Sequence, residues 1–594
     1  MSDVRSNPTS LAVLFAISVV SIVALYGRSL DYQLAWMDET EIGEAAIVLA
    51  PGTPWSAAFT RPLHASSQGI NPYYRPLQIL VATAIHRVAG PTPRYYRVAL
   101  FAAAIGTAFA FGVLALHLFA SLPLAIAAML VATVHPAMIE SWVWISGLGE
   151  ALAGFFTIAS VGCAALALER GPRARLWALF SLAALALGLL SKEKSVVVPA
   201  LVAALWLSQR LATAGVRGIS ADRAALRTAT LLVGAQIALV AIYLALRPIL
   251  MGRGLVAAPP IGGDRVTHLL SALASWPGSI AWLAAPMHST ASDGVAIVRS
   301  FTDWHVWLGA ALPIATLALA LVAALCGRPV AAFGLAWVWI AFLPTSNLFP
   351  QIHARAERYL FLSAFGYALV LADVFRAIAA RIHPRATIPA ATAGVLIVAL
   401  GFAERTWVRI PAWQSTETLF RTDLARDPSY REGRFHLATV LIASGRFAEA
   451  QAELQRLRAP STQEHSGYVN AIGVEQLLCA TELGLGDPAQ AVALLERLER
   501  EGSPAAQDPS IRTCAAQAFE AMGHPRAAAA LYEKVVASLG GAEPPASVSL
   551  AIARTQASLG RREEARRWLE RARANGPREP GFDFQVMQVE KRLR

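Results

Sequence analysis

Long apolar runs separated by short charged stretches fill the first 400 residues of the chain. A helix that crosses the roughly 30 Å hydrocarbon core of a bilayer needs about 20 apolar residues. Eleven runs approach this length, whereas 75–89 is short and 267–287 contains Pro277 and Pro286, which suits a broken or surface-lying helix. We therefore predict an all-α membrane bundle of about 11–13 spans. The eleven regular runs are 10–28, 97–119, 122–139, 148–168, 174–190, 194–209, 227–249, 304–326, 329–345, 357–377 and 386–403.

Charged residues between the runs predict how the bundle is oriented. Arginines gather at 170–175, 210–227 and 376–385, while the stretch 31–44 after the first run is acidic. Because arginine-rich loops stay on the cytoplasmic side, the acidic stretch should lie outside. Eleven spans satisfy all of these loops and leave the C-terminal region outside. A twelfth span at 75–89 breaks the alternation downstream, and the sequence leaves both counts open. The first run has no small-residue cleavage site, which is typical of an uncleaved signal anchor.

A repeated pattern replaces the apolar runs after about residue 404. The fragments GRFAEA, GDPAQA, GHPRAA and GRREEA begin at residues 445, 486, 523 and 560, at spacings of 41, 37 and 37. Each begins with a glycine at a tight turn and ends with an alanine where the second helix packs on the first. This is the tetratricopeptide signature. We predict a membrane domain at 1–404 and a soluble solenoid of about four helical hairpins at 405–594. Its groove suits a peptide or partner protein, or the array is only a spacer.

Composition supports the membrane assignment and narrows the choice of partners. The 594-residue chain is 55% hydrophobic and 15% charged, whereas soluble domains carry about 25% charged residues. The arginines behind the net charge of +11 cluster in short loops between apolar runs, so membrane lipids rather than nucleic acid are the expected partners. Richness in Pro, Ala and Arg is typical of a bacterial protein. We therefore expect a multi-pass inner-membrane protein whose repeats are periplasmic.

The four cysteines do not have the spacing of a disulfide framework. Cys163 and Cys326 fall in apolar runs and are expected to pack there. Cys479 and Cys514 lie 35 residues apart in the repeat region, where a bond between neighbouring hairpins requires an oxidising compartment. We expect these two thiols to remain free.

Two clusters near the first external loop contain candidate catalytic residues. Asp38 and Glu39 directly follow the first span, where a carboxylate can act as general base towards an acceptor hydroxyl or orient it. Acidic loop residues are more often only solvated. Tyr73, Tyr74 and Arg75 form the second cluster, in which the arginine can grip a phosphate through paired donors. Ordinary anchoring at the membrane interface is the alternative.

A third cluster flanks two tryptophans in the stretch 135–150. It contains His135, Glu140 and Glu150. These carboxylates can contact a sugar, a metal or each other, but one histidine and separated glutamates do not have the spacing of a metal site. We expect no metal.

The fourth cluster combines Lys192, at the end of one run, with His353 and Arg358, which precede another. Cationic groups at the end of a span can neutralise a departing phosphate. For Lys192, snorkelling of an ordinary interfacial lysine is an equally good interpretation.

These clusters, in this order and followed by the repeats, resemble the transmembrane and tetratricopeptide-repeat O-mannosyltransferases of the GT-C superfamily. The resemblance covers nearly the whole chain. It departs from the family where a glycine-arginine pair is replaced by Gly147-Leu148, and where the paired aspartates of the first loop are Asp38-Glu39. The segments that carry it are DET at 38–40, YRPL at 74–77, HPAMIESWVWISGLGE at 135–150, KEKS at 192–195, FLPTSNLFPQIHARAERYLFLS at 342–363 and RIPAWQSTETLF at 409–420.

The resemblance implies an integral membrane glycosyltransferase. It would move a mannose-like sugar from a polyprenyl-phosphate donor to an acceptor hydroxyl, preferably of a protein serine or threonine, with inversion and without a cofactor. Asp38 would be the base and the cations would receive the phosphate. The implied set is catalytic Asp38 and Glu39, donor-phosphate-binding Arg75, Lys192 and Arg358, and substrate-pocket Tyr74, His135, Glu140, Glu150 and His353.

Two other classes of function remain open. A non-catalytic scaffold would use the repeats to assemble an envelope or polysaccharide complex, and it would not require Asp38. A transporter of lipid-linked sugars would place charged residues deep inside its spans, whereas nearly all the charges here fall at span ends.

Overall fold

The computed structural model describes residues 7–38, 41–42, 52–60, 63, 73–251, 258–287, 290–292, 294–458, 469, 471–576 and 580–593. Throughout these residues the chain is helical, without a β-strand. It divides into two compact units. The first comprises residues 1–430 and 463–467, and the second 431–462 and 468–594.

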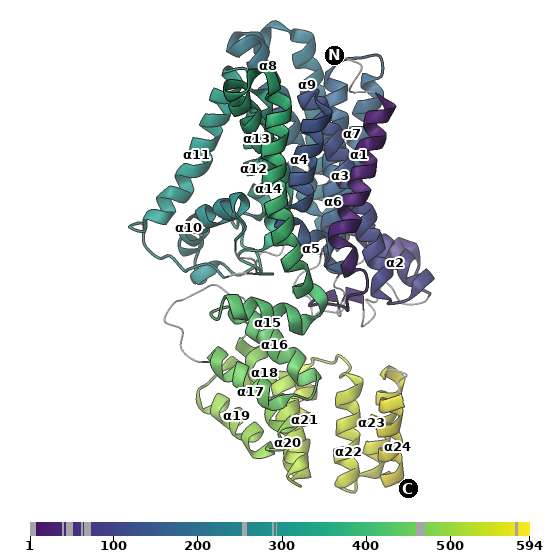
Figure 1. Ribbon diagram of the computed structural model, residues 1–594. Coiled ribbons are helices and arrows are strands. Elements are labelled where there is room, and N and C mark those ends of the chain that lie inside the picture. The colour runs from purple at the N-terminus through teal and green to yellow at the C-terminus, as the bar shows by residue number, and fades with distance from the viewer. Residues whose placement is uncertain are drawn as a thin grey trace. The chain divides into compact units, whose positions relative to one another are not determined.

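The first unit is a helical bundle that confirms the predicted all-α membrane fold (Figure 1). Its principal helices are α1 (Pro8–Tyr26), α2 (Pro76–Ala89), α3 (Pro93–Phe119), α4 (Leu122–Val134), α5 (Ile139–Trp142), α6 (Leu148–Leu168), α7 (Ala174–Ser191), α8 (Val198–Ala221), α9 (Arg223–Met251), α10 (Arg265–Ala284), α11 (Trp304–Leu325), α12 (Pro329–Phe342), α13 (Phe361–Ile382), α14 (Thr387–Arg409) and α15 (Thr416–Arg426).

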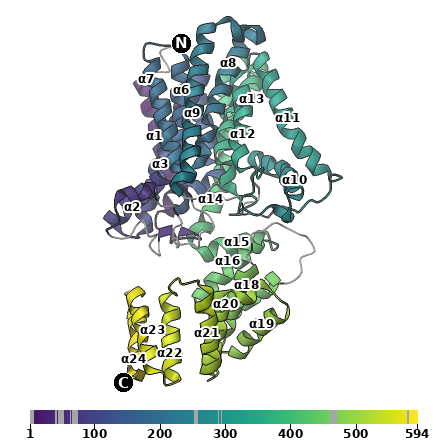
Figure 2. The same ribbon diagram turned by 180° about the vertical axis from the view of Figure 1, so that it is seen from behind.

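Nine helices within the described residues are long and apolar enough to cross a membrane. The pair α4 and α5, bent by 60°, makes up to ten, and the shorter apolar helix at Pro329–Thr345 accounts for the remaining predicted run. Helices α2 and α10 lie at the end of the bundle where α1 and α14 finish, which we call the site end (Figure 1, Figure 2). Because α2 starts and finishes there, it does not alter the alternation of the spans.

Because the spans alternate in direction, the arginine-rich loops and the acidic residues after α1 lie at opposite ends of the bundle. The arginine-rich connections α6–α7, α8–α9 and α13–α14 all lie at the end opposite the site end (Figure 1). Asp38 and Glu41, two described acids of the segment after α1, lie at the site end, where they contact Ser146 just before α6. This arrangement is the one that the eleven-span count requires.

Close helix contact in the bundle depends on glycine. Helices α12 and α13 approach each other at Gly334 and Gly366, where a Cβ added to either residue would lie 2.7 Å from the carbonyl oxygen of the other. Small residues allow membrane helices to pack backbone to backbone. This contact holds the beginning of α13, and the site residues just before it, against the rest of the bundle.

The second unit is the predicted solenoid of helical hairpins. All four repeat glycines have positive φ, from 72° at Gly445 to 79° at Gly486, and the four repeat alanines are fully buried. The turns and the close helix contacts therefore lie where the repeat pattern predicts them. Its helices are α16 (Arg431–Ala443), α17 (Phe447–Arg458), α18 (Ala471–Gly484), α19 (Pro488–Arg500), α20 (Pro509–Ala521), α21 (Pro525–Ser538), α22 (Ala546–Ser558), α23 (Arg562–Asn575) and α24 (Pro580–Leu593).

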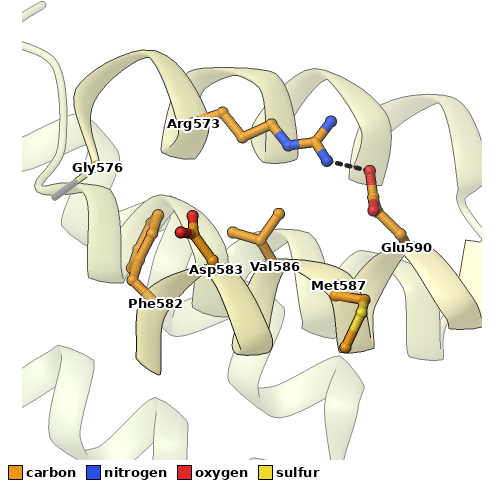
Figure 3. Close-up of a pocket in the computed structure, with 7 residues that line it drawn as sticks. All are labelled: Arg573, Gly576, Phe582, Asp583, Val586, Met587 and Glu590. Atoms are coloured by element: carbon orange, nitrogen blue, oxygen red, sulfur yellow. Dashed lines mark hydrogen bonds and ion pairs between the residues drawn. The ribbon is translucent and has the colours of Figure 1, made fainter. Parts of the chain in front are cut away.

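Helix α24 follows the last repeat and packs on its hairpin. Between α23 and α24 lies a cavity of about 210 Å³ (Figure 3). Arg573 of α23 is paired with Glu590 of α24 beside it, and Phe582 and Val586 form part of its apolar wall. Helix α24 therefore covers one face of this hairpin.

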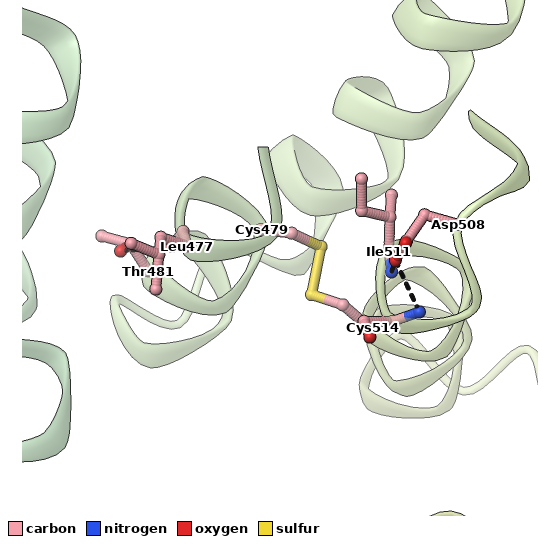
Figure 4. The surroundings of a disulfide bond; sticks show 7 residues. Leu477, Cys479, Thr481, Asp508, Ile511 and Cys514 are labelled. Carbon is pink, nitrogen blue, oxygen red and sulfur yellow. Dashed lines mark hydrogen bonds between the residues drawn. A yellow bond between two sulfur atoms is a disulfide. The ribbon is translucent and has the colours of Figure 1, made fainter. Parts of the chain in front are cut away.

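A disulfide joins neighbouring repeats, so the expectation of two free thiols was wrong. Cys479 of α18 and Cys514 of α20 are bonded, with their Cα atoms 6.2 Å apart (Figure 4). Their separation of 35 residues is close to the repeat spacing. This brings them face to face in the core between consecutive hairpins. Cys163 and Cys326 are free, and Cys326 is exposed at the end of α11 instead of packed.

Candidate functional site

Segments far apart in the sequence meet at the site end of the first unit. Helices α1, α7 and α14 finish there, and α6, α8 and α13 begin there (Figure 1). Short 3-10 helices continue several of these ends, including Ile145–Gly147, Glu193–Val197 and Glu357–Leu360. Glu193, Lys194, Glu357 and Arg358 lie on two of these short segments, and the other charged residues of the site lie in loops or at neighbouring helix ends.

Asp38 is fully buried in the loop after α1. Its Oδ1 accepts hydrogen bonds from the backbone N and the Oγ of Ser146, at 2.8 and 2.7 Å, and its Oδ2 accepts from Ala35 N at 3.2 Å. Burial raises the pKa of Asp38 to about 6, although the bonds from Ser146 oppose the shift. The carboxylate is therefore oriented, and it titrates close to neutral pH.

The loop that carries Asp38 is held from two sides. Trp36 stacks on Trp144 with ring centres 5.0 Å apart, and its backbone N donates to Thr416 Oγ1 at 2.8 Å. Trp36 has φ of 56°, a left-handed conformation that a bulky residue adopts only when its surroundings impose it. Arg97 of α3 is buried beneath the loop and donates to the carbonyls of Tyr32 and Gln33.

A second carboxyl group lies beside Asp38. Glu39 lies outside the described residues, but Glu41 is buried, and its side chain is hydrogen-bonded to Ser146. Burial, with the charge of Asp38 second, raises the pKa of Glu41 to about 8, while Arg75 and Lys192 act in the opposite direction. Glu41 and Ser146 were not predicted as site residues. Glu41 is one of several acids in its loop, and only the fold distinguishes it from the others.

Arg75 lies just before α2 and faces the segment after α7. Its Nε and Nη2 approach the two carboxylate oxygens of Glu193 at 3.4 and 3.5 Å. Its guanidinium also lies over the ring of Tyr73, 4.3 Å from the ring centre. The predicted phosphate ligand is thus paired with a carboxylate and an aromatic face.

Glu150, in the first turn of α6, is buried between two lysines. Lys194 Nζ lies 2.5 Å from Glu150 Oε1 and donates to the carbonyl of Arg358 at 2.8 Å. Lys192 pairs with the other carboxylate oxygen of Glu150. Burial lowers the pKa of Lys192 to about 8, against the opposing effect of Glu150. The charges of Arg75 and Arg358 also act on Lys192, so three predicted phosphate ligands share one region.

Arg358, just before α13, pairs with Glu140 of α5 through Nη1 at 2.8 Å. Its guanidinium lies 5.4 Å from the ring centre of Trp144 and 5.7 Å from that of Trp36. Trp36, which belongs to the Asp38 loop, and Trp144, which stacks on it, therefore both lie near the guanidinium of Arg358. This brings the general-base candidate and the phosphate candidates together.

The segment after α14 belongs to the first unit rather than to the repeats. Arg409 and Asp423 form a buried ion pair between α14 and α15, and Arg409 also lies 3.6 Å from Glu357. Asp423 Oδ2 accepts from the backbone N of Ala291 at 2.8 Å. The compact first unit therefore extends through Tyr430, beyond the predicted boundary at 404, because α15 completes its ionic core.

The three remaining predicted residues lie around this network. His135 is buried among Trp282, Tyr367 and Phe402, with its Nε2 donating to the carbonyl of Leu283 and its Nδ1 accepting from Ala137 N. These hydrogen bonds stabilise the bend between α4 and α5, where His135 lies. His353 contacts the Trp36 ring at 5.2 Å and Ser292 Oγ at 3.1 Å. Tyr74 packs against Tyr243 of α9, 6.2 Å between ring centres.

The arrangement combines an oriented base with cations that are already surrounded by counterions. The site carboxylates lower the cost of burying the cations, since an unpaired charge in this environment is expensive. An incoming phosphate would find donors held in place by these pairs, so little reorganisation is needed when charge develops on it.

Comparison with known proteins gives a short but relevant similarity. No protein-family model matches the chain. Protein O-mannosyl-transferase TMTC4 from Mus musculus is 30% identical over 156 residues, and the same protein from Homo sapiens is 31% identical over 157 residues. Each match covers 25% of this chain and 21% of the relative, so the chain spans about a fifth of the length of these curated relatives.

Solved structures give weaker similarities. The apo oligosaccharyltransferase of Archaeoglobus fulgidus matches 68% of this chain and 55% of its own, at 15% identity and a TM-score of 0.38. A tetratricopeptide repeat protein of Parabacteroides merdae matches 47% of this chain and 98% of its own, at 13% identity and a TM-score of 0.25. Both scores are too low to support a structural argument.

Proposed function

We propose that the chain is an integral membrane glycosyltransferase that moves a mannose-like sugar from a polyprenyl phosphate to a hydroxyl group of a protein serine or threonine. The observation that carries the proposal is the meeting of buried, oriented Asp38 with Arg75, Lys192 and Arg358 at one end of the bundle. The short match to relatives named protein O-mannosyl-transferases supports the same class.

In the proposed reaction Asp38 takes the proton of the acceptor hydroxyl. The hydroxyl oxygen forms a bond to the anomeric carbon while the bond from that carbon to the donor phosphate oxygen breaks. The phosphate leaves with the electron pair, and the cations stabilise its charge. One displacement inverts the anomeric configuration. A pKa of about 6 suits a general base at neutral pH, because the group is largely ionised yet remains an effective proton acceptor.

The proposed site faces outward from the cytoplasm. The arginine-rich connections lie at the opposite end of the bundle, and such loops are retained in the cytoplasm. The chain leaves α14 at the site end, so the repeats follow on the outer side. The disulfide between Cys479 and Cys514 fits an oxidising compartment such as the periplasm. We propose that the repeats bring an extended acceptor protein to the membrane surface.

The two alternatives differ in what they require of the site. A transporter needs charged groups near the middle of the membrane, whereas the ionic network here lies at span ends. A scaffold does not require Asp38. Metal independence stays a prediction; within the described residues no three His, Cys, Asp or Glu side chains are grouped to hold an ion.

The decisive experiment is Asp38→Asn in the full-length protein. Transfer of mannose from polyprenyl-phosphate mannose to cell-envelope proteins should fall by about 10²–10⁴-fold, the usual contribution of a general base. Asp31→Asn is the matched control, because Asp31 lies in the same loop but is largely exposed and pairs with Arg94 at the surface. The measurement is glycopeptide mass spectrometry of cells that carry each variant. Undiminished transfer by Asp38→Asn would favour the scaffold.

A further inference from the structure

Helix α9 has one narrow face that is buried in the protein. Over its last two turns only Tyr243 and Arg247 are buried, whereas Ile242, Leu246 and Ile249 are exposed. Residues four positions apart lie above one another on a helix, so Tyr243 and Arg247 share one face. The other faces of these turns are apolar and suit lipid chains.

Each of these two side chains has a buried polar atom without a hydrogen-bond partner in the described part of the chain. Arg247 Nη1 and Tyr243 Oη are each buried without a hydrogen bond. A buried cation without an ion pair is costly at membrane depth and is normally explained by a ligand or a functional pathway. Two such groups on neighbouring turns of one helix, directed to the same side, point to one missing polar ligand.

The surroundings indicate that this ligand is an anion. The charges of Arg247 and Arg75 both act on Glu193, but Glu193 makes its hydrogen bonds to Arg75. Glu193 therefore interacts with two guanidinium groups but is hydrogen-bonded to only one of them. The Tyr74–Tyr243 ring contact joins α9 to the segment that carries Arg75. A phosphate has only acceptor oxygens, so it can receive the guanidinium and phenol protons that are unused here.

We propose that Arg247 and Tyr243 bind the phosphate of a lipid beside Arg75, with the lipid chain along the apolar outer face of α9. That the lipid is the polyprenyl-phosphate donor rests on the proposed function. That the ligand is a phosphate rests only on the side chains of Arg247 and Tyr243. Arg247 is then a phosphate ligand that no sequence motif singled out. It would allow the donor to enter from the membrane between α9 and the segment before α2.

The test uses purified full-length protein in lipid nanodiscs, with undecaprenyl phosphate as the donor-like probe and phosphatidylglycerol as the ordinary anionic lipid. We expect Arg247→Gln to weaken binding of undecaprenyl phosphate about tenfold or more, and Tyr243→Phe to weaken it by a smaller factor. Arg227→Gln is the matched control, because Arg227 is exposed on the same helix at the opposite end of the bundle. It should bind the probe as the unaltered protein does. Native mass spectrometry measures the occupancy.

Thermal unfolding separates a ligand site from a structural role. Without probe, Arg247→Gln should melt at the same temperature as the unaltered protein or higher, because an unpaired buried charge is removed. With probe, the unaltered protein should gain stability and the variant should not. If the variant loses only undecaprenyl phosphate, the ligand is a polyprenyl phosphate. If it loses phosphatidylglycerol equally, the site binds any lipid phosphate. Unchanged binding of both lipids, or a large fall in the melting temperature without probe, overturns the proposal.

The inference and the proposed function fail in different ways. Asp38→Asn should lose sugar transfer and keep the binding of undecaprenyl phosphate. If Arg247→Gln loses the lipid while the unaltered protein transfers no sugar, the lipid site stands and the transferase proposal falls.

Discussion

The site end of the first unit and the repeat solenoid use charge in opposite ways. At the site end several ion pairs are buried and join residues far apart in sequence, as in Arg358–Glu140, separated by 218 residues. In the solenoid many are partly exposed and local, as in Arg446–Glu449, one helical turn apart. The solenoid core consists of apolar side chains and fully buried alanines. Charged residues therefore form a buried network at the site end of the first unit, whereas in the solenoid many of them lie at the surface.

The largest effect on stability is expected at Asp423. Asp423→Asn removes the nearest counterion of buried Arg409 and leaves the more distant Glu357 as its ion-pair partner, and breaking a buried pair costs about 3–5 kcal/mol. Because Asp423 also holds the backbone of Ala291, whose carbonyl lies 3.5 Å from Arg358 Nη1, sugar transfer should fall as well. The measurement is equilibrium unfolding of the full-length protein in mixed micelles.

Glu417→Gln is the control for Asp423→Asn. Glu417 lies on the same helix and forms a partly exposed pair with Arg421, which is worth about 0.3–0.5 kcal/mol. Equal destabilisation by the two variants would show that the buried Arg409–Asp423 pair contributes no more to stability than the partly exposed Glu417–Arg421 pair.

The next effect should arise in the solenoid. A disulfide that closes a loop of 35 residues stabilises the fold by about 4 kcal/mol through the entropy of the unfolded chain. The double variant Cys479→Ser, Cys514→Ser should therefore expose the repeats to limited proteolysis at a lower temperature and leave the first unit resistant. Cys163→Ser, which removes a free thiol, should change neither unit. Detection of free thiols at both positions in protein isolated without reductant would contradict this prediction.

The smallest effect is a pH dependence confined to the site. Asp38 must be ionised to accept a proton, so kcat/KM should fall about tenfold per unit as pH drops below about 6. Lys192 must be protonated to stabilise a phosphate, so activity should fall again as pH rises through about 8. Lys192→Arg should move the upper limit to higher pH, because a guanidinium stays charged. A pH profile that is flat from 5 to 9 would exclude both assignments.

Ionisation of Asp38 also affects the free energy of unfolding, and it lowers the stability of the fold. The pKa of Asp38 is raised in the folded protein, so folding favours its protonated form. Its ionisation therefore destabilises the fold as pH rises from about 4 to about 6. Above pH 6 this contribution is constant. The base is thus kept ionised at neutral pH at a cost in stability, which the ordered bonds from Ser146 reduce.

Local patterns made the solenoid predictable. A glycine at a turn and an alanine five residues later act within one hairpin, so Gly523 and Ala528 fulfil their roles wherever the hairpin lies. The disulfide was accessible to the same reasoning, since a separation near the repeat spacing places two cysteines on facing helices. The expectation of free thiols followed general cysteine usage instead of the repeat geometry.

The site was predictable only in part. Asp38, Lys192 and Arg358 could be selected because they lie beside apolar runs in segments that resemble a known transferase family. Asp423 could not be selected, because in sequence it is an ordinary polar residue of a short helix, and its burial depends on Ala291, 132 residues away. Arg247 was counted as part of an apolar run, and only the direction of its side chain reveals that it faces the protein.

The extent of the first unit sets a rule for engineering this architecture. A junction chosen from the change in composition along the sequence would fall near residue 404, before α15. Here a cut before α15 would discard the partner of Arg409 and the anchor of Trp36 at Thr416. Chimeras that test new acceptor preferences should therefore be joined after Tyr430, so that the first unit keeps the contacts of α15.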